Sequence, residues 1–257
     1  MRSIEEPFLC RFIRRIVDFV YPEMELLGLE NLPEEASIIV GNHAQVHGPI
    51  ITEERLPFDH YTWCIAQMMN QAEVAEYAYR DFWVKKPTYI RWLYWLASRM
   101  IPIPASYILS HGRTIPVYRD NRCITTFRKT MEKLEDGYHI VIYPEHEVPY
   151  NNILWEFEDR FIDIARLYYK RTGKSLQFVP MYLAPKLRKI FLGKPIRFQP
   201  EQPMAQERER IRLALMESIT QLAVSQPLHT VIPYPNLPKK QYPKNLPREV
   251  YTHAEEI

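Results

Sequence analysis

Glycine is scarce in this chain, at 7 of 257 residues, whereas proline contributes 22. With so little flexible backbone, we expect each glycine to mark a turn, a helix end or a close backbone contact. The prolines gather near the C-terminal end, where they recur every few residues from Pro227 onward. Residues 226–257 are therefore predicted to form a proline-rich tail that is extended, and that either wraps over the surface or stays mobile.

Cysteine is also rare, and its three residues, Cys10, Cys64 and Cys123, are far apart. An odd number without close spacing argues against a disulfide framework and favours a reducing compartment. No pair has the C-x-x-C spacing of a zinc ribbon, and we expect no structural metal. The formal net charge is only +2, so the sequence lacks the broad basic footprint of a nucleic-acid-binding protein.

Long apolar runs are missing as well. The richest candidate, residues 92–109, is interrupted by Arg99, Pro102 and Pro104. This leaves no stretch of about 18 apolar residues to span a membrane. Hydrophobic residues still make up 46% of the chain, which is enough for a sizeable folded core.

Two segments suit a membrane surface. Residues 1–22 predict an amphipathic helix whose apolar face is flanked by arginines, and such a helix either lies on anionic lipid or packs on the domain. Glu5 and Glu6 precede its apolar positions, which argues against a secretory signal. Residues 71–100 are aromatic-rich and predicted to be helical, and their aromatic side chains suit either packing in the core or a belt at a membrane interface. Their aromatic and basic residues are Trp83, Trp92, Tyr94, Trp95, Lys85, Lys86, Arg91 and Arg99.

Strand-like and helix-like segments alternate along the rest of the chain. Short apolar runs predict strands at 25–29, 37–40, 61–66, 114–118, 139–143 and 176–183, and helical periodicity predicts helices at 49–56, 71–100, 122–135, 154–171 and 205–224. Pro180 points to an edge strand or a sheet end, and residues 190–198 predict a hairpin. The alternation predicts a single α/β domain over residues 23–225, with a largely parallel central sheet flanked by helices.

Polar side chains follow three of the predicted strands directly. These are His43, Arg119 and Glu145. In parallel α/β sheets the carboxyl ends of the strands gather ligand-binding groups at one edge. Each residue also has a structural interpretation: His43 as a capping or satisfied core histidine, Arg119 as the partner of Asp120 or of a helix residue in a surface ion pair, and Glu145 as an acceptor for backbone N–H groups after the strand.

The same segments resemble, in order, the conserved blocks of the glycerolipid acyltransferase family, the 1-acylglycerol-3-phosphate or PlsC-like acyltransferases. Residues 42–49 read NHAQVHGP, which is similar to the family's NHxxxxDP block, and residues 28–33 resemble its lead-in. Residues 115–119 end in an arginine like the second block. Residues 143–145 read YPE, similar to the start of FPEGTRS, and residues 178–181 resemble the valine–proline strand. The resemblance covers roughly residues 24–200.

This resemblance implies transfer of a fatty acyl group from acyl-CoA or acyl-carrier protein to a hydroxyl acceptor such as a lysophospholipid or glycerol-phosphate. His43 would be the general base, because an alcohol is a weak nucleophile until a base takes its proton. The implied catalytic residues are His43, His47 and Glu145, and the implied substrate-binding residues are Asn42, Arg119, Tyr143, Pro144 and His146. No cofactor beyond the acyl donor is expected. The expected location is cytoplasmic, peripheral on the inner face of the membrane.

The sequence departs from the family in two blocks. Gly48 stands in place of the aspartate that orients the histidine, and His146-Glu147-Val148 stands where Gly-Thr-Arg is expected. Candidates to replace the aspartate are His47, Glu53, Glu54, Glu145 and Glu147. Candidates to replace the arginine are Lys186, Arg188 and Lys189.

Two other functions stay open. Gly48 and Val148 suit a non-catalytic relative that binds lipid or acyl thioester. His43 and His47 have i, i+4 spacing, so they suit a metal-dependent hydrolase if the third block supplies further ligands. The HExxH glutamate of metalloproteases is absent.

Overall fold

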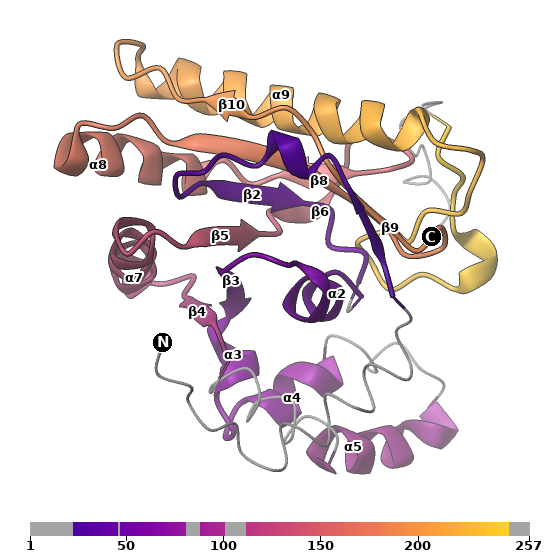
Figure 1. Ribbon diagram of the computed structural model, residues 1–257. Helices are drawn as coiled ribbons and strands as arrows, with labels where there is room; N and C mark the ends of the chain where they lie inside the picture. The colour runs from indigo at the N-terminus through magenta and orange to yellow at the C-terminus, as the bar shows by residue number, and fades with distance from the viewer. Residues whose placement is uncertain (1–22, 46, 81–87, 101–111, 247–257) are drawn as a thin grey trace.

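An eight-stranded sheet forms the centre of the computed structural model, which describes residues 23–45, 47–80, 88–100 and 112–246 (Figure 1). Its strands lie in the order β1–β9–β8–β2–β5–β3–β4, and β10 also pairs with β8. Their bounds are Glu25–Leu27 (β1), Ile38–Gly41 (β2), His60–Ile65 (β3), Thr114–Val117 (β4), His139–Ile142 (β5), Gln177–Ala184 (β8), Lys189–Leu192 (β9) and Ile196–Arg197 (β10). The helix predicted within residues 1–22 lies outside the described residues, as do Trp83, Lys85 and Lys86.

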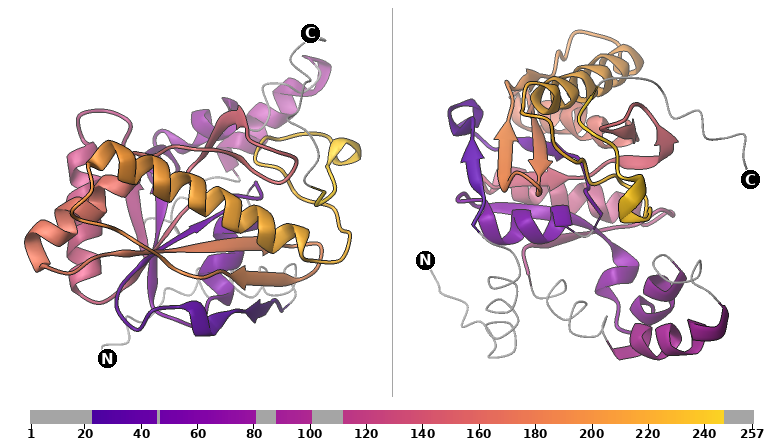
Figure 2. Two further views of the ribbon diagram at one scale, coloured as in Figure 1. Left: turned by 90° about the horizontal axis from the view of Figure 1, so that it is seen from above. Right: turned by 90° about the vertical axis from the view of Figure 1, so that its right-hand side faces the viewer.

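Helices cover both faces of this sheet (Figures 1 and 2). Their bounds are His47–Arg55 (α2), Ala66–Met69 (α3), Val74–Ala78 (α4), Arg91–Met100 (α5), Cys123–Glu135 (α7), Asp163–Thr172 (α8) and Met204–Val224 (α9). Strands β4, β3, β5, β2 and β8 are all parallel to their neighbours in that series. The predicted α/β domain with a largely parallel sheet is therefore confirmed.

The alternation of side chains along the buried strands creates two cores. Ile38 and Val40 of β2 pack with α7, α8 and α9 on one face, whereas Ile39 packs with Ile51 of α2 on the other. Successive residues of a strand point to opposite faces, so a strand that is buried on both faces must be apolar throughout. All four residues of β2 are buried, and this explains the uninterrupted apolar run before His43.

Pro180 does not mark a sheet edge as predicted, because β8 lies between β2 and β9. Proline cannot donate a ladder hydrogen bond, so a central strand tolerates it only where no acceptor is waiting. The carbonyl of Pro180 accepts the N–H of Gly193, which lies in the gap between β9 and β10. The missing N–H therefore faces a break in the neighbouring strands.

Two local predictions are wrong. Residues 190–198 do not form a hairpin with each other, because β9 and β10 both pair with β8. The helix predicted at 154–171 begins only at Asp163; Trp155–Phe157 forms β7 instead, which pairs with β6 (Glu145–Pro149) in a separate two-stranded sheet. The helical periodicity over residues 154–171 therefore extended across β7, a short strand that pairs with the preceding strand β6.

Two buried histidines face each other across the amino ends of β3 and β5. His60 and His139 are register partners, and Nδ1 of His139 lies 2.9 Å from Oγ of Ser37. Burial, with a smaller contribution from the nearby His60, lowers the pKa of His139 to about 4. The pKa of His60 is also lowered, mainly by burial, while Arg113 and Asp59 act on it in opposite directions.

The free energy of unfolding is therefore expected to fall as the pH is lowered from about 6.5 to 4. The unfolded chain takes up a proton near pH 6.5, whereas the folded protein takes it up at His139 only near pH 4. The loss from this histidine is at most about 3 kcal/mol, at roughly 1.4 kcal/mol per pKa unit. Urea unfolding between pH 4 and 8 checks this. In His139→Asn the slope should be shallower, and equal slopes in both proteins would contradict the assignment.

None of the helices among the described residues is long and apolar enough to cross a membrane.

Candidate functional site

The loop after β2 presents His43 at the carboxyl edge of the parallel strands. Asn42, which is 2% exposed, extends the ladder between β2 and β8 with its side chain. Its Nδ2 donates to the carbonyl of Leu183 at 3.1 Å, and its Oδ1 accepts the Leu183 N–H at 2.7 Å. Both polar ends of the Asn42 side chain thus bond to the backbone of β8, and they hold the main chain just before His43 in place. Its assignment to substrate binding stays a prediction.

Glu145 holds the backbone on both sides of the site. Its Oε2 accepts the N–H of His43 at 2.5 Å, and its Oε1 accepts the N–H of Trp155 at 3.0 Å. The residue is buried, and burial raises its pKa to about 7, although these two hydrogen bonds oppose the rise. The carboxylate therefore ties the end of β2 to the β6–β7 hairpin, as the structural interpretation of Glu145 anticipates.

The imidazole of His43 lies between two tyrosine rings. Ring centroids are 5.3 Å away for Tyr143 and 5.8 Å for Tyr234, and both contacts are edge-on. Nδ1 of the imidazole is buried and has no hydrogen-bond partner among the described residues. The pKa of His43 is lowered mainly by burial, and backbone groups of Gln45 and His43 offset this only in part. A neutral imidazole is the form that a general base requires.

Gly48 fits tightly against the backbone of this loop. Its N–H donates to the carbonyl oxygen of His43 at 3.1 Å, and a Cβ added at position 48 would lie 2.3 Å from that oxygen. An aspartate could not simply be added at position 48, because this loop has no room there for any side chain. None of the proposed replacements from the described chain hydrogen-bonds to Nδ1 of His43.

Tyr143 and Pro144 lie beside the histidine at the end of β5. The hydroxyl of Tyr143 donates to Oγ1 of Thr52 in α2 at 2.9 Å, and burial raises the pKa of this phenol. Pro144 is buried, and its carbonyl accepts the N–H of Glu158. Both residues shape the wall around His43, and their roles toward a substrate stay predictions.

Two other predicted site residues lie apart from His43. Arg119 is exposed after β4, three strands away from β2, which corresponds to about 14 Å at the usual spacing of strands. Asp120, its predicted ion-pair partner, pairs with Arg122 at 2.7 Å instead. His146 neighbours Glu145 in β6 and lines an open hollow with Glu156, Arg212 and others. The structure therefore groups His43, His47, Asn42, Tyr143, Pro144 and Glu145, but not these two.

Cationic groups gather next to His47, which begins α2. Its pKa is lowered by burial first, and then by the positive charges of Lys186 and Lys239. Lys186 is exposed just after β8, and Lys239 is exposed in the C-terminal segment. Lys189, another candidate to replace the missing arginine, instead pairs with Glu25 at 3.0 Å. Lys186 is thus a candidate that the structure places near His47.

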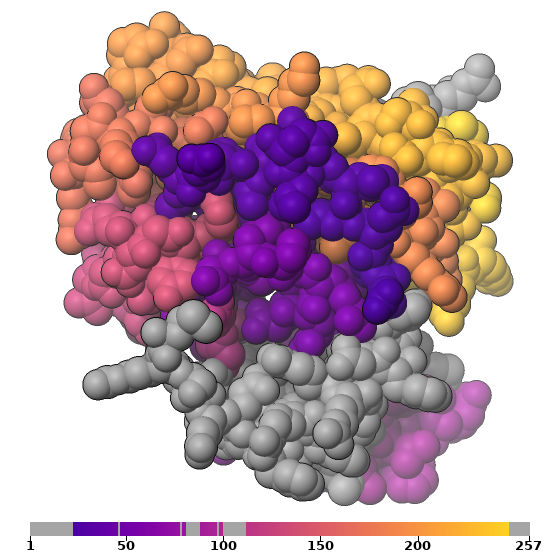
Figure 3. Space-filling view, in the orientation of Figure 1, coloured from indigo at the N-terminus to yellow at the C-terminus, as the bar shows by residue number. Residues whose placement is uncertain are grey.

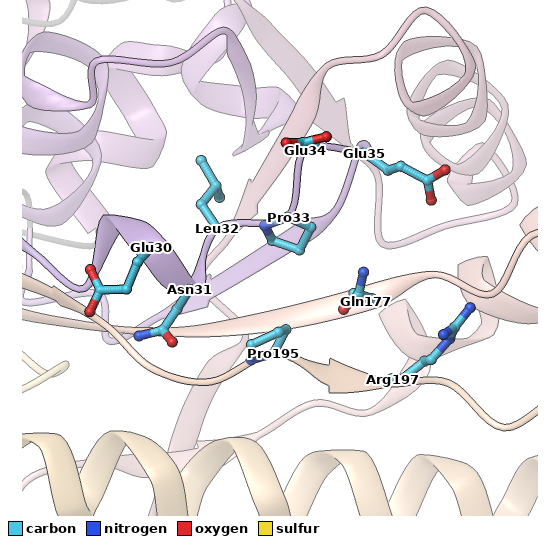
Figure 4. Close-up of a pocket in the computed structure, with 9 residues that line it drawn as sticks. All are labelled: Glu30, Asn31, Leu32, Pro33, Glu34, Glu35, Gln177, Pro195 and Arg197. Carbon is cyan, nitrogen blue, oxygen red and sulfur yellow. The ribbon is translucent and has the colours of Figure 1, made fainter.

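Two open hollows lie away from this loop, and neither is lined by His43, His47 or Tyr143. One, of about 460 Å³, opens between the segment before β2 and the strands β8 and β10 (Figure 4). It includes Gln177 at the amino end of β8, whereas His43 lies at the opposite, carboxyl edge. Within the described ranges, no three His, Cys, Asp or Glu side chains are grouped so that they could hold a metal ion. The arrangement of side chains therefore does not favour the metal-dependent hydrolase.

The structure adds one component that the sequence analysis did not connect with the site. Tyr234 comes from the proline-rich tail, for which the sequence predicts either wrapping over the surface or mobility, and no role in the site. The described part of that tail does wrap over the domain and reaches the His43 loop (Figure 2). The regular proline spacing is the one feature of the sequence that bears on this contact. Prolines stiffen a chain, but they do not indicate which part of the domain it contacts.

Comparison with known proteins supports the fold. No protein-family model and no curated protein sequence matches the chain. Among solved structures, the chain is similar to the 1-acyl-sn-glycerophosphate (LPA) acyltransferase PlsC from Thermotoga maritima, with 14% sequence identity and a TM-score of 0.50. The match covers 85% of this chain and 80% of that one. The similarity extends to the fold of most of the domain.

Proposed function

We propose that this protein is an acyltransferase that moves a fatty acyl group from an acyl thioester to the hydroxyl of a lysophospholipid, glycerol-phosphate or related acceptor. The observation that carries the proposal is the position of His43. It lies at the carboxyl edge of a sheet like that of PlsC, with its backbone N–H held by Glu145 and its imidazole packed against two tyrosine rings. Acyl-CoA and acyl-carrier protein are the candidate donors.

In the proposed reaction, His43 takes the proton of the acceptor hydroxyl while the alcohol oxygen attacks the thioester carbonyl. Loss of the thiolate completes the transfer, and the proton held by the imidazole passes to the thiolate sulfur. No covalent acyl–enzyme is required. Lys186 and Lys239, beside His47, are suited to an anionic acceptor headgroup, and their placement offsets the arginine that the third block lacks.

A transfer assay tests this proposal. Purified protein is incubated with labelled acyl-CoA or acyl-carrier protein, anionic vesicles and a panel of lysophospholipids and alcohols. We expect label in a lipid product that depends on the protein. The second candidate is a non-catalytic relative that binds the same ligands, and the unpartnered Nδ1 of His43 favours it. Binding of acyl thioester without transfer would support that candidate.

We also propose that the protein works on a membrane surface and that α5 contacts it. Large apolar side chains of this helix are exposed, with Trp92 at 68% and Trp95 at 47%. The helix contains Arg91 and Arg99 but no acidic residue, and Arg99 lies over the ring of Trp95 at 4.3 Å. Tryptophan and arginine on one cationic helix suit the interface of an anionic bilayer. The helix lies at the rim of the molecule (Figure 3).

Replacing both Trp92 and Trp95 with serine is expected to weaken binding to anionic vesicles at least tenfold. Burying an apolar side chain contributes about 1.5–3 kcal/mol, so even half of this for two residues gives more than a tenfold effect. Vesicle sedimentation measures the binding. The matched control is Ile124→Ser, which removes a side chain of 74% exposure from α7. Equal binding by the double variant and the control would remove α5 as the contact.

A further inference from the structure

The loop that carries His43 has an unfavourable backbone conformation. Ala44 and Gln45 follow the histidine directly, with φ of 47° and 58°. Residues other than glycine seldom adopt this left-handed backbone conformation, which costs each of them about 1–2 kcal/mol. Two such residues in succession persist only where the surrounding structure holds them.

The C-terminal segment supplies contacts that hold this loop. Nε2 of Gln45 donates to the carbonyl of Pro235 at 3.0 Å, and Oε1 of Gln45 accepts the hydroxyl of Tyr242 at 3.1 Å. Both polar ends of one strained side chain are thus bonded to residues about 190 positions later in the chain. We call residues 227–246 the strap.

The strap is itself anchored on the domain. Nε2 of His229, a residue that is 5% exposed, shares a 2.7 Å hydrogen bond with the hydroxyl of Tyr182 in β8. The backbone N–H of His229 donates to Oδ1 of Asn245 at 2.8 Å. Asn245 also donates to the carbonyl of Ala223 at the end of α9. Both ends of the strap are therefore fixed, and the part between them is held against the His43 loop.

Between these anchors, Tyr234 reaches the imidazole. Its ring lies edge-on to His43 at 5.8 Å and is tilted against Trp155 at 6.2 Å. Trp155 is the residue whose N–H is held by Glu145, which also holds His43. The strap, the β6–β7 hairpin and the His43 loop consequently converge on one imidazole.

We infer that Tyr234 is a positioning residue for His43 and that the strap is part of the site. In place of a carboxylate on Nδ1, two tyrosine rings confine the imidazole, and Tyr143 provides the second. Nδ1 itself is buried without a hydrogen-bond partner, so ring packing orients the imidazole. This inference rests on the proposed function for its meaning in catalysis, but the packing itself can be tested without any substrate.

An NMR titration of the histidine side chains tests it. The resonance of His43, one of 8 histidines, is assigned by its loss in His43→Gln. Groups that face or neighbour this imidazole are Tyr143, Tyr234 and Glu145. His47 lies further along the loop, and the charges of Lys186 and Lys239 act on it. In wild type, His43 should titrate below the usual pH. Tyr234→Phe keeps the ring and should match wild type, whereas Tyr234→Ala should shift the titration upward toward pH 6.5.

A second pair of variants tests the hydrogen bonds to Gln45. Gln45→Ala removes both bonds to the strap and should shift the His43 titration in the same direction as Tyr234→Ala. Tyr242→Phe removes one bond and should have a smaller effect. If the protein transfers acyl groups, Tyr234→Ala should lower turnover by about three- to tenfold, with an upward shift of the acid limb of its pH profile. Tyr234→Phe should retain turnover.

An unchanged His43 titration in folded Tyr234→Ala would overturn the inference. So would a rise in turnover in Gln45→Ala, because the strap would then be a cover that obstructs the site. If no acyl transfer is found, but the titration shifts as expected, the positioning of His43 stands and only the proposed reaction fails. Unchanged titrations of the other histidines in each variant show that the fold is intact.

Discussion

Replacing His43 with glutamine should lower acyl transfer by about 10²- to 10⁴-fold, the range that a positioned general base contributes. Glutamine keeps most of the volume between Tyr143 and Tyr234 but cannot take a proton at neutral pH. The loss should appear in turnover more than in the Michaelis constant of the acceptor, because the proton moves only in the transition state. Initial rates with labelled acyl thioester measure it.

The control for this variant is His60→Gln. It makes the same change in a buried histidine at the opposite end of the sheet, where it disturbs packing but not the site. Its turnover should stay within about twofold of wild type at a temperature where both proteins are folded. A similar loss in the two variants would mean that destabilisation, rather than the lost base, explains the effect.

Introducing an aspartate at position 48 by Gly48→Asp, as in the family block that residues 42–49 resemble, should destabilise the protein by about 3 kcal/mol or more, without raising activity. The new Cβ would lie 2.3 Å from the carbonyl oxygen of His43, and backbone cannot rotate away as a side chain can. The carboxylate would also be buried, since Gly48 is buried. Chemical unfolding gives the change in stability, and the transfer assay gives the change in activity.

Gly137→Ala serves as the comparison for Gly48→Asp. Gly137 has φ of 92°, but a Cβ added there would meet nothing within 4 Å, so alanine at this position encounters backbone strain alone. We expect Gly137→Ala to lower the free energy of unfolding by about 1–2 kcal/mol. If Gly48→Asp is no more destabilising than this and increases turnover, the loop can accommodate a carboxylate at position 48, and the tight fit at Gly48 has no bearing on catalysis.

Much of the fold follows from local patterns in the sequence. The apolar runs that end before His43 and Glu145 are buried strands, because β2 and β5 lie inside the sheet with both faces covered. The prediction that each glycine marks a close contact or helix end holds at Gly48 and Gly173. These features depend on residues near one another in sequence.

The errors and omissions depend on distant partners. Pro180 indicated an edge, yet the break between β9 and β10 makes a central position acceptable. Trp155–Phe157 continued a helical periodicity, yet pairs with β6. Tyr234 reaches His43 from about 190 positions away, and no local pattern states that contact. Sequence reasoning therefore named His43, Tyr143 and Glu145 but not Tyr234.

The most direct measurement of the central claim is the mass of the lipid product formed by the wild-type protein. A lysophospholipid acceptor, an acyl thioester of known chain length and anionic vesicles are incubated with the protein. We predict a product heavier than the acceptor by that acyl group, formed in proportion to the protein and lost in His43→Gln. Stable binding of acyl thioester with no acylated product from either donor, across the acceptor panel, would contradict the acyltransferase assignment.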